Sequence, residues 1–208
     1  MSCSMEFFET NYNLLHSGMA TDLFSLREKT FNSRLAWQVE CKNGMEKDHF
    51  DNENTIYLLG MSQGHLVCGA RFIDICHENM ITTVFSDFFD GISLPDDAPC
   101  YDVSRLFIDK KRRETANLTD KPVSRAMFVA MIKLCQKNNR EGMYAIVSRG
   151  MYRIFMLSGW NVKMLKKGWS EKNEAVYFIY MPATQEAIHF IREKEIDCAF
   201  IDSVAYPA

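Results

Sequence analysis

The sequence predicts an α/β or α+β fold: one central sheet with helices on its faces, in a single domain. Two apolar, β-favouring runs at residues 56–61 and 65–75 are separated by Ser62-Gln63-Gly64, a pattern typical of a hairpin. Further along, a strand pattern at 101–108, a helical pattern and an apolar strand at 142–147 follow the order of a β-α-β unit. At 208 residues the chain suits one domain with a sizeable core. We therefore expect a single domain over residues 1–208.

The first half carries three further element signals. A short strand is expected at residues 5–9, and apolar residues three and four apart predict a helix at 19–33. Residues 34–54 are mostly irregular, and a loop this long in a compact domain is usually functional or mobile. Residues 79–89 are apolar and aromatic, which predicts a short helical piece that ends before Pro95.

The second half predicts a helix between two buried strands. The charged residues 109–121 are expected to form a loop, and Pro122 then suits the first turn of a helix that reaches residue 137. Its apolar face would hold Val123, Met127, Met131, Ile132 and Cys135. The remaining expected elements are a helix at 151–157, strands at 160–165 and 175–181, a helix at 184–194 and a tail at 195–208.

Composition excludes several protein classes. No apolar run approaches the roughly 18 residues of a membrane span, and the N-terminus lacks a signal-peptide pattern, so we expect no membrane insertion. The seven cysteines are odd in number and scattered, which favours reduced thiols and a cytoplasmic location.

Charge is unevenly spread along the chain. Residues 105–172 hold 16 Lys or Arg against 5 Asp or Glu, an excess of 11 positive charges, although the formal net charge is −3. Such a region favours an acidic protein partner or a phosphorylated ligand. Because no nucleic-acid-binding motif accompanies it, we expect no nucleic acid partner; a basic surface without any partner is the alternative.

Common catalytic motifs are missing. The sequence has no G-x-S-x-G, no G-x-x-x-x-G-K-[ST] and no G-x-G-x-x-G, so it signals neither a hydrolase elbow nor a nucleotide loop. The five histidines lack metal-ligand spacing, and we expect neither a metal nor a cofactor.

The most informative stretch is residues 27–51. Arg27 and Phe31 are four apart and leave one face of the predicted helix together, and Trp37, Asp48 and Asp51 follow in the loop. Carboxylates bind an ammonium, arginine binds a carboxylate, and aromatic faces bind an onium centre. These residues therefore suit a small, cationic, amino-acid-like ligand. The alternative is an ordinary aromatic core beside a solvated charged loop.

Charges also interrupt the apolar strands. Arg71 lies within one strand, and Asp102, Ser104 and Arg105 lie at the start of another. Buried charges are costly unless paired, so we expect ion pairs between these arginines and the aspartates of the loop or Asp102. Such a network either fixes the loop to the sheet or forms a polar pocket for a zwitterion.

The aromatic and charged residues described above resemble the pattern of a known family, the acyl-homoserine-lactone synthases. The resemblance rests on the residues above and on the segments RxxxFxxRLxW, GMExDxFDN and IVSxxMxRIxxxSGW, and it covers roughly residues 5–182. It implies an α/β, N-acetyltransferase-like fold with a mixed central sheet flanked by helices. It also implies two partners, S-adenosylmethionine as a substrate and an acyl-acyl-carrier protein. The amine of S-adenosylmethionine would attack the thioester, and lactonisation would release methylthioadenosine, yielding a quorum-sensing signal.

The resemblance also implies residue roles. Arg27, Phe31, Trp37, Asp48, Asp51 and Arg71 would bind S-adenosylmethionine. Asp102 would be the base, although the family commonly has Glu there, and Arg105, like Arg27, would hold a carboxylate or brace the aspartates. Backbone N–H groups at a bulge beside Ser104 would hold the thioester oxyanion. The acyl pocket would comprise Met127, Ala145, Val147, Met151 and Phe155. Ala145 lacks the hydroxyl that accompanies 3-oxo products in the family, which favours an unsubstituted chain. The carrier protein would dock on Arg149, Arg153, Lys163, Lys166 and Lys167.

One departure from the N-acetyltransferases bears on the acyl donor. Their glycine-rich turn holds the coenzyme A pyrophosphate, whereas residues 109–124 of this chain contain no glycine. We therefore expect a carrier-protein donor. The alternatives are a coenzyme A-dependent N-acyltransferase of the same fold and a non-catalytic binding module.

Overall fold

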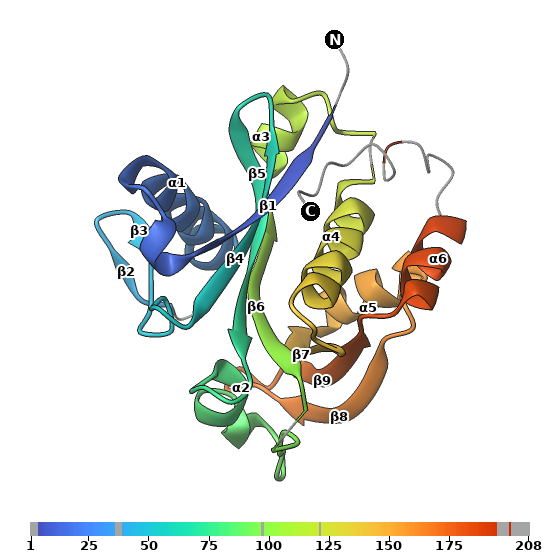
Figure 1. Cartoon of the computed structure of the whole chain (residues 1–208). Helices are drawn as coiled ribbons and strands as arrows, with labels where there is room; N and C mark the ends of the chain where they lie inside the picture. Colours follow the sequence, from blue (N-terminus) through green and yellow to red (C-terminus); the bar gives the residue numbers. More distant parts are fainter. Residues whose placement is uncertain (1–3, 36–38, 97, 121, 195–199, 201–208) are drawn as a thin grey trace.

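The computed structural model describes residues 4–35, 39–96, 98–120, 122–194 and 200. Within them, seven strands form one mixed sheet in the order β1-β4-β5-β6-β7-β9-β8 (Figure 1). The strands are β1 (Glu6–Asn11), β4 (Thr55–Ser62), β5 (His65–Asp74), β6 (Cys100–Ile108), β7 (Gly142–Ser148), β8 (Lys163–Trp169) and β9 (Ala175–Pro182). Only β6 and β7 pair in parallel among these described strands. The expected single domain with a mixed sheet flanked by helices is confirmed.

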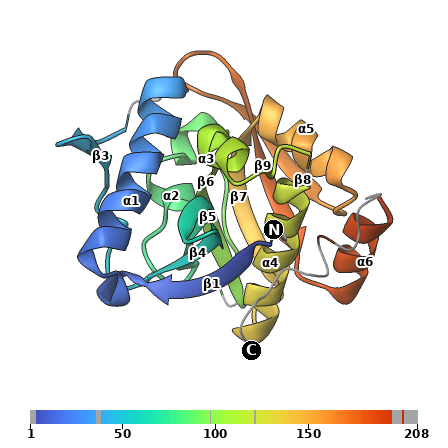
Figure 2. The same ribbon diagram turned by 90° about the horizontal axis from the view of Figure 1, so that it is seen from above.

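Helices cover both faces of the sheet. They are α1 (Ser17–Arg27), α2 (Met80–Thr83), α3 (Lys110–Thr115), α4 (Val123–Lys137), α5 (Arg149–Ser158) and α6 (Gln185–Glu193). Helices α4, α5 and α6 pack on one face, and α1 packs on the other (Figures 1 and 2). None of the helices in the described ranges is long and apolar enough to cross a bilayer.

An irregular segment with one 3₁₀ turn, Ser86–Phe88, covers part of the α1 side of the sheet. Residues 84–96, which we call the strap, cross β7, β9 and β8, and Phe89 packs edge-on against Phe178. The Lys166 ammonium of β8 donates to the carbonyls of Asp90 and Gly91. The strap therefore closes this face and ties it to the edge strand.

Strands β6 and β7 separate soon after they begin. Their pairing covers only Cys100–Asp102 against Gly142–Tyr144. Beyond it, Arg71 of β5 pairs with Ser104 of β6, and Gly69 pairs with Phe107. One residue of β5 but two residues of β6 lie between these two pairs, so β6 carries a bulge. Arg105 takes up this bulge with a left-handed φ of 55°. The bulge bends β6 away from β7 and leaves backbone groups outside the ladder.

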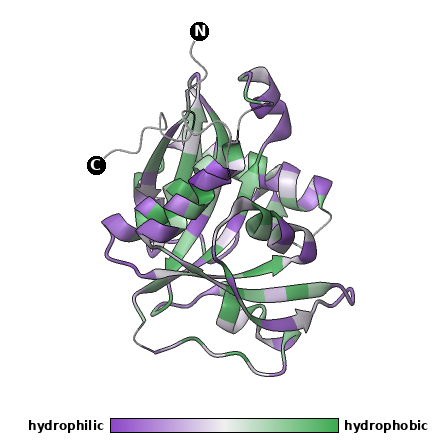
Figure 3. Ribbon diagram, turned by 90° about the vertical axis from the view of Figure 1, so that its right-hand side faces the viewer, coloured by the Kyte–Doolittle hydropathy of each residue, from purple (hydrophilic) through white to green (hydrophobic). Residues whose placement is uncertain are grey.

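The structure differs from the predicted elements in three places. Residues 109–121 were expected to be a loop, but Lys110–Thr115 form α3, which is polar along its length (Figure 3). The helix expected at 19–33 is α-helical only to Arg27 and continues as a π-helical turn, Glu28–Arg34. The strand expected from residue 160 begins at Lys163, because Trp160 is buried and its Nε1 donates to Pro182.

Two predicted segments lie partly outside the described residues. The predicted loop at 34–54 contains two-residue strands, β2 (Cys41–Lys42) and β3 (Met45–Glu46), while residues 36–38 lie outside the described ranges. Its mobility stays a prediction. Of the tail at 195–208, only Phe200 is described, and it is buried.

Candidate functional site

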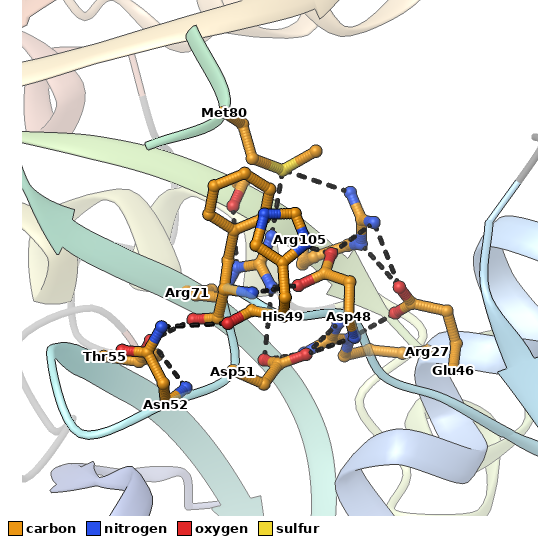
Figure 4. Close-up of polar contacts among 12 residues, drawn as sticks. Arg27, Glu46, Asp48, His49, Asp51, Asn52, Thr55, Arg71, Met80 and Arg105 are labelled. Carbon is orange, nitrogen blue, oxygen red and sulfur yellow. Dashed lines mark hydrogen bonds and ion pairs between the residues drawn. The ribbon is translucent and has the colours of Figure 1, made fainter. Parts of the chain in front are cut away.

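Three arginines from three elements meet three carboxylates from one loop (Figure 4). We call this group the charged cluster; its members are Arg27 of α1, Arg71 of β5, Arg105 of β6, and Glu46, Asp48 and Asp51 of the loop. Five of the six are buried, and the side chain of Asp48 is 9% exposed. The sequence analysis expected Arg27, Asp48, Asp51, Arg71 and Arg105 to share a site, and the fold brings them together.

Helix α1 and the loop deliver the first part of the cluster. Arg27 is at the end of α1, one turn beyond Leu23, which is buried against β4 and β5. Its Nη1 and Nη2 donate to the two oxygens of Asp51 at 2.7 and 2.9 Å, and its Nε donates to Glu46 at 2.5 Å. Asp51 also accepts from the Tyr57 hydroxyl at 2.8 Å and from the Asp48 N–H at 3.0 Å. These bonds fix the loop on the helix.

Electrostatics keep Asp51 ionised. Burial alone would raise its pKa, but the guanidinium groups of Arg27 and Arg71 outweigh burial and hold the pKa well below its usual range. Conversely, burial opposes the charge on Arg27, and the carboxylates of Asp51 and Glu46 reverse this and raise its pKa. The pair is charged at every pH at which the protein would work.

The strands supply the second part. Arg71 donates from Nη1 and Nη2 to Asp48 at 2.5 and 3.1 Å, and from Nε to the Ser104 hydroxyl at 3.0 Å. Arg105 donates from Nε to Glu46 at 3.0 Å and from Nη2 to Asp48 at 2.9 Å. These bonds fix the loop to the sheet, which is one of the two arrangements that the sequence analysis expected.

The cluster is balanced in charge. Three guanidinium groups face three carboxylates, so the buried set carries no net charge. Asp48 and Asp51 thus order the loop, one of the two roles expected of them. Direct contact between these carboxylates and a ligand ammonium stays a prediction.

Asp102 lies beside the cluster but pairs differently. Its Oδ2 accepts from the Met80 N–H at 2.9 Å, at the start of α2. Asp102 is 2% exposed, and this burial raises its pKa to about 6, although the N–H groups of Met80 and Ile81 and the charge of Arg71 act against the rise. A carboxyl group with this pKa gains and loses a proton near neutral pH, as a general base must. The role expected for Asp102 is thus compatible with its surroundings.

Aromatic rings lie against the guanidinium groups. The Phe31 ring is 5.6 Å from Arg105 Cζ, and the Phe50 ring is 5.6 Å from Arg71 Cζ. Phe31 was expected at this site, whereas Trp37 lies outside the described residues. A hollow of about 930 Å³ between α1 and the β2–β3 hairpin is lined by other residues, among them Tyr12, Phe24 and Lys47. The six residues of the charged cluster do not line this hollow.

A family model described as autoinducer synthase matches residues 11–191 of the chain. The chain belongs to the autoinducer synthase family. An acyl-homoserine-lactone synthase of Serratia liquefaciens is 45% identical over 179 residues, which cover 86% of this chain and 89% of the relative. The protein is therefore an acyltransferase, an acyl-homoserine-lactone synthase.

Solved structures agree with the fold of an autoinducer synthase. The structure of BjaI, a CoA-dependent acyl-homoserine lactone synthase with SAM and isopentyl-CoA, superposes with a TM-score of 0.82 at 19% identity and covers 99% of this chain and 94% of BjaI. An acyl-CoA N-acyltransferase from Pseudomonas aeruginosa gives a TM-score of 0.58 at 10% identity, covering 86% of this chain and 99% of that one. These likenesses confirm the N-acetyltransferase-like fold.

The expected acyl-pocket residues of this synthase lie on the other face of the sheet. Met127, Ala145 and Phe155 are buried in the core beneath α4 and α5, and Val147 and Met151 are half-buried beside it. Tyr144 pairs with Asp102 across the β6–β7 ladder. Its side chain packs under the strap, on the opposite face of the sheet from these apolar residues. The separation of β6 and β7 therefore lies between the charged cluster and these apolar residues.

The five basic residues expected to bind a carrier are divided between two faces. Arg149 and Arg153 of α5 are exposed, and Lys167 lies opposite Tyr177, whose ring stacks on α5. Lys166 lies opposite Phe178 and holds the strap. Lys163, opposite Tyr180, shares the strap face. Lys166 and Lys167 face opposite sides because consecutive strand residues alternate, and a bulge between Met164 and Lys166 sets Lys163 on the same face as Lys166. The structure therefore does not bring the five together.

Two members of the synthase site were missed from the sequence. Glu46 is fully buried between two arginines, and Met80 contacts Arg71 and Arg105 through its sulfur. Glu46 stands within the GMExDxFDN segment that carried the resemblance, which was the available signal. Met80 stands in an apolar run and gave none.

Proposed function

We propose that this synthase transfers an acyl group from an acyl-carrier protein to the amine of S-adenosylmethionine. The amine nitrogen bonds to the thioester carbon, and the carrier thiol leaves. The methionine carboxylate then bonds to its own γ-carbon while the carbon–sulfur bond breaks, which releases methylthioadenosine and the lactone. S-adenosylmethionine is thus a substrate, and the proposal needs no cofactor.

The observation that carries the proposal is the position of Asp102. It lies in the last residue pair that joins β6 to β7, beside the charged cluster and just before the two strands separate. An amino-acid substrate over the cluster and a thioester in the separation would meet there. The amine must lose a proton to attack, and Asp102, with its pKa of about 6, accepts it. Because Asp is shorter than Glu, we propose that one water relays the proton.

The bulge of β6 suits the thioester oxyanion. The left-handed Arg105 lies between the register pairs of Ser104 and Phe107, so backbone groups there are released from the ladder. Free N–H groups aimed at a developing oxyanion lower the barrier by several kcal/mol, about 3 for one donor. Ser104 is held by Arg71 Nε at 3.0 Å and keeps this geometry in place.

The fold alone does not determine the acyl donor, because BjaI is a CoA-dependent synthase of the same fold. Segment 109–120 is closed by its own contacts: the Asp109 carboxylate caps α3 at 2.8 Å from Arg112 N, and Arg113 donates to the Leu118 carbonyl. Arg149, Arg153 and Lys167 remain exposed around α5 and suit an acidic carrier. We place the reaction in the cytoplasm, in keeping with the free thiols of Cys41 and Cys76 at the surface.

The acyl chain would run from the β6–β7 separation into the core beneath α4. Ala145 is buried there without a hydroxyl that could bond a 3-oxo group, and we propose an unsubstituted chain.

Methylthioadenosine release, measured by chromatography, tests the proposal. We expect release only when S-adenosylmethionine and an acyl-carrier protein are both present. Release with acyl-coenzyme A, and none with carrier proteins of any acyl length, would establish the alternative donor. Thiol release from acyl-coenzyme A with a simple amine in place of S-adenosylmethionine would instead identify a general N-acyltransferase.

A further inference from the structure

The chain leaves α1 through a π-helical turn, Glu28–Arg34. The bond that marks this form runs from the Leu35 N–H to the Thr30 carbonyl, five residues back, at 3.1 Å. Turns of this kind are rare, and they occur frequently at functional sites. Since an α-helix is the ordinary way to continue α1, side chains of this segment must favour the wider turn.

The Glu28 side chain spans this turn. Its Oε1 accepts from Asn32 Nδ2 at 3.0 Å and from the Ser33 hydroxyl at 3.0 Å. On an α-helix, the residue four positions after Glu28 lies on the same face. The residue five positions after it lies about 140° around the axis, because one turn takes 3.6 residues. The bond from Ser33 to Glu28 therefore belongs to the wider turn and stabilises it against the α-helical form.

Phe31 lies in the middle of the π-helical turn. It is 3% exposed, packs in the core between α1 and the sheet, and places its ring 5.6 Å from Arg105 Cζ. Of the two aromatic residues expected to bind S-adenosylmethionine, Phe31 is the one within the described chain. The form of the turn sets the direction in which its ring leaves the backbone. Whatever holds the turn therefore also holds this ring.

We propose that Glu28 is a positioning residue of this synthase: its bonds to Asn32 and Ser33 hold the π-helical turn, and the turn holds the Phe31 ring in place for S-adenosylmethionine. The inference rests on the proposed function and adds a residue to it. Glu28 acts through Phe31 and does not have to touch the substrate. A carboxylate suits this part, because charge-assisted hydrogen bonds are roughly twice as strong as neutral ones.

Binding of S-adenosylmethionine to Glu28 variants, measured by calorimetry, tests the role. Glu28→Ala removes both side-chain bonds, and we expect the dissociation constant to rise about three- to tenfold, with the KM for acyl-carrier protein unchanged. Glu28→Gln keeps an acceptor oxygen at the same place and should restore binding to within about twofold of the unaltered protein. Lys29→Ala, at an exposed position of the same turn, is the matched control and should bind normally.

A double-mutant cycle with Phe31→Leu shows whether Glu28 acts through the ring. Once the ring is gone, the turn has nothing to position, so adding Glu28→Ala to Phe31→Leu should change the dissociation constant by less than about twofold. An undiminished loss in the Phe31→Leu background would mean that Glu28 acts by another route, and it would overturn the inference. A lower melting temperature of Glu28→Ala with an unchanged dissociation constant would also overturn it, because the role would then be structural only.

Ser33→Ala decides the matter if Glu28→Ala does not fold. It removes only the bond that belongs to the wider turn, from an exposed residue, so we expect binding of S-adenosylmethionine to weaken about two- to threefold. An unchanged constant would refute the role of Glu28. Absence of S-adenosylmethionine binding by the unaltered protein would instead refute the proposed function. Normal binding by both the unaltered protein and Glu28→Ala would refute only the positioning role.

Discussion

Glu46 joins Arg27 to Arg105 through its two carboxylate oxygens. Oε2 lies 2.5 Å from Arg27 Nε, and Oε1 lies 3.0 Å from Arg105 Nε. The side chain is fully buried, so a two-residue strand in a polar loop connects α1 to the central strand β6. This one carboxylate makes the two sides of the cluster a single structure.

Neutralising Glu46 should therefore destabilise the fold. Glu46→Gln keeps the shape but leaves an uncompensated positive charge in the interior, and breaking a buried pair in this way costs about 3–5 kcal/mol. Urea denaturation measures the loss. Glu40→Gln, at an exposed position of the same loop, is the matched control and should change stability by no more than about 0.5 kcal/mol. Equal effects of the two substitutions would contradict the role of Glu46.

Asp102 should control the acidic limb of the pH–rate profile. Because its pKa is raised to about 6, the carboxyl group is protonated below that pH and accepts no proton from the amine. We expect turnover to fall as pH drops through about 6, and Asp102→Asn to lower turnover by about 10²–10⁴-fold. A profile of Asp102→Asn that keeps both the rate and the acidic limb would show that another group is the base.

The contributions of Asp102 and Asp51 to the free energy of unfolding should change with pH in opposite directions. The raised pKa of Asp102 means that its stabilising contribution is complete below its ordinary pKa of 3.8 and is lost as pH rises through about 6. The lowered pKa of Asp51 means that its contribution is present above 3.8 and is lost as pH falls. We therefore expect Asp102→Asn to be more stable relative to the unaltered protein at pH 8 than at pH 4. Urea midpoints at the two pH values check the sign, and the reverse order would contradict it.

Carrier use should depend on the α5 side of the basic region. Arg153→Glu reverses an exposed charge next to Arg149 and is expected to raise the KM for acyl-carrier protein at least tenfold, with the KM for S-adenosylmethionine unchanged. Lys110→Glu, an exposed reversal on α3, controls for net charge and should have a much smaller effect. An equal rise in both KM values for Arg153→Glu would place docking elsewhere.

The packing of the strap against β8 should depend on the absence of a side chain at Gly168. A Cβ at this position would overlap the Phe88 carbonyl oxygen and the Phe89 ring, so Gly168→Ala forces the strap off β8. We expect a loss of about 1–3 kcal/mol, measured by denaturation. Gly150→Ala on α5 is the control, because its Cβ would meet nothing closer than Ser148 Oγ at 3.9 Å, and it should be neutral or slightly stabilising. A fully stable Gly168→Ala protein would mean that the strap yields without cost.

Elements with a strong apolar period were predicted well from the sequence. The β4–β5 hairpin, β6, α4 and β7 appear within one or two residues of their expected bounds, because each buries a continuous apolar face. Helix α3 was missed because Lys110–Thr115 has no apolar stripe; the Asp109 cap and tertiary contacts of Arg112 to Asp22 at 2.6 Å hold it.

The candidate site was predicted in outline, since paired charges in apolar strands require partners. What the sequence could not give was which charges are buried: Glu46 stands in a polar loop and becomes buried only when α1 and β6 close on it. Alternation along β8 already separates Lys166 from Lys167, whereas the bulge that sets Lys163 on the face of Lys166 leaves no signal in the sequence. Met80 looks like core in any pattern and shows its polar contacts only in three dimensions.

The equal number of cations and anions in the cluster has a consequence for redesign. Neutralising any one of the six leaves the buried cluster with a net charge. Removing a directly bonded pair, such as Arg27→Met with Asp51→Leu, keeps its net charge at zero. Variants of this enzyme with altered substrate preference should accordingly be sought in coupled libraries, where positions mutate as complementary partners, rather than by scanning one position at a time.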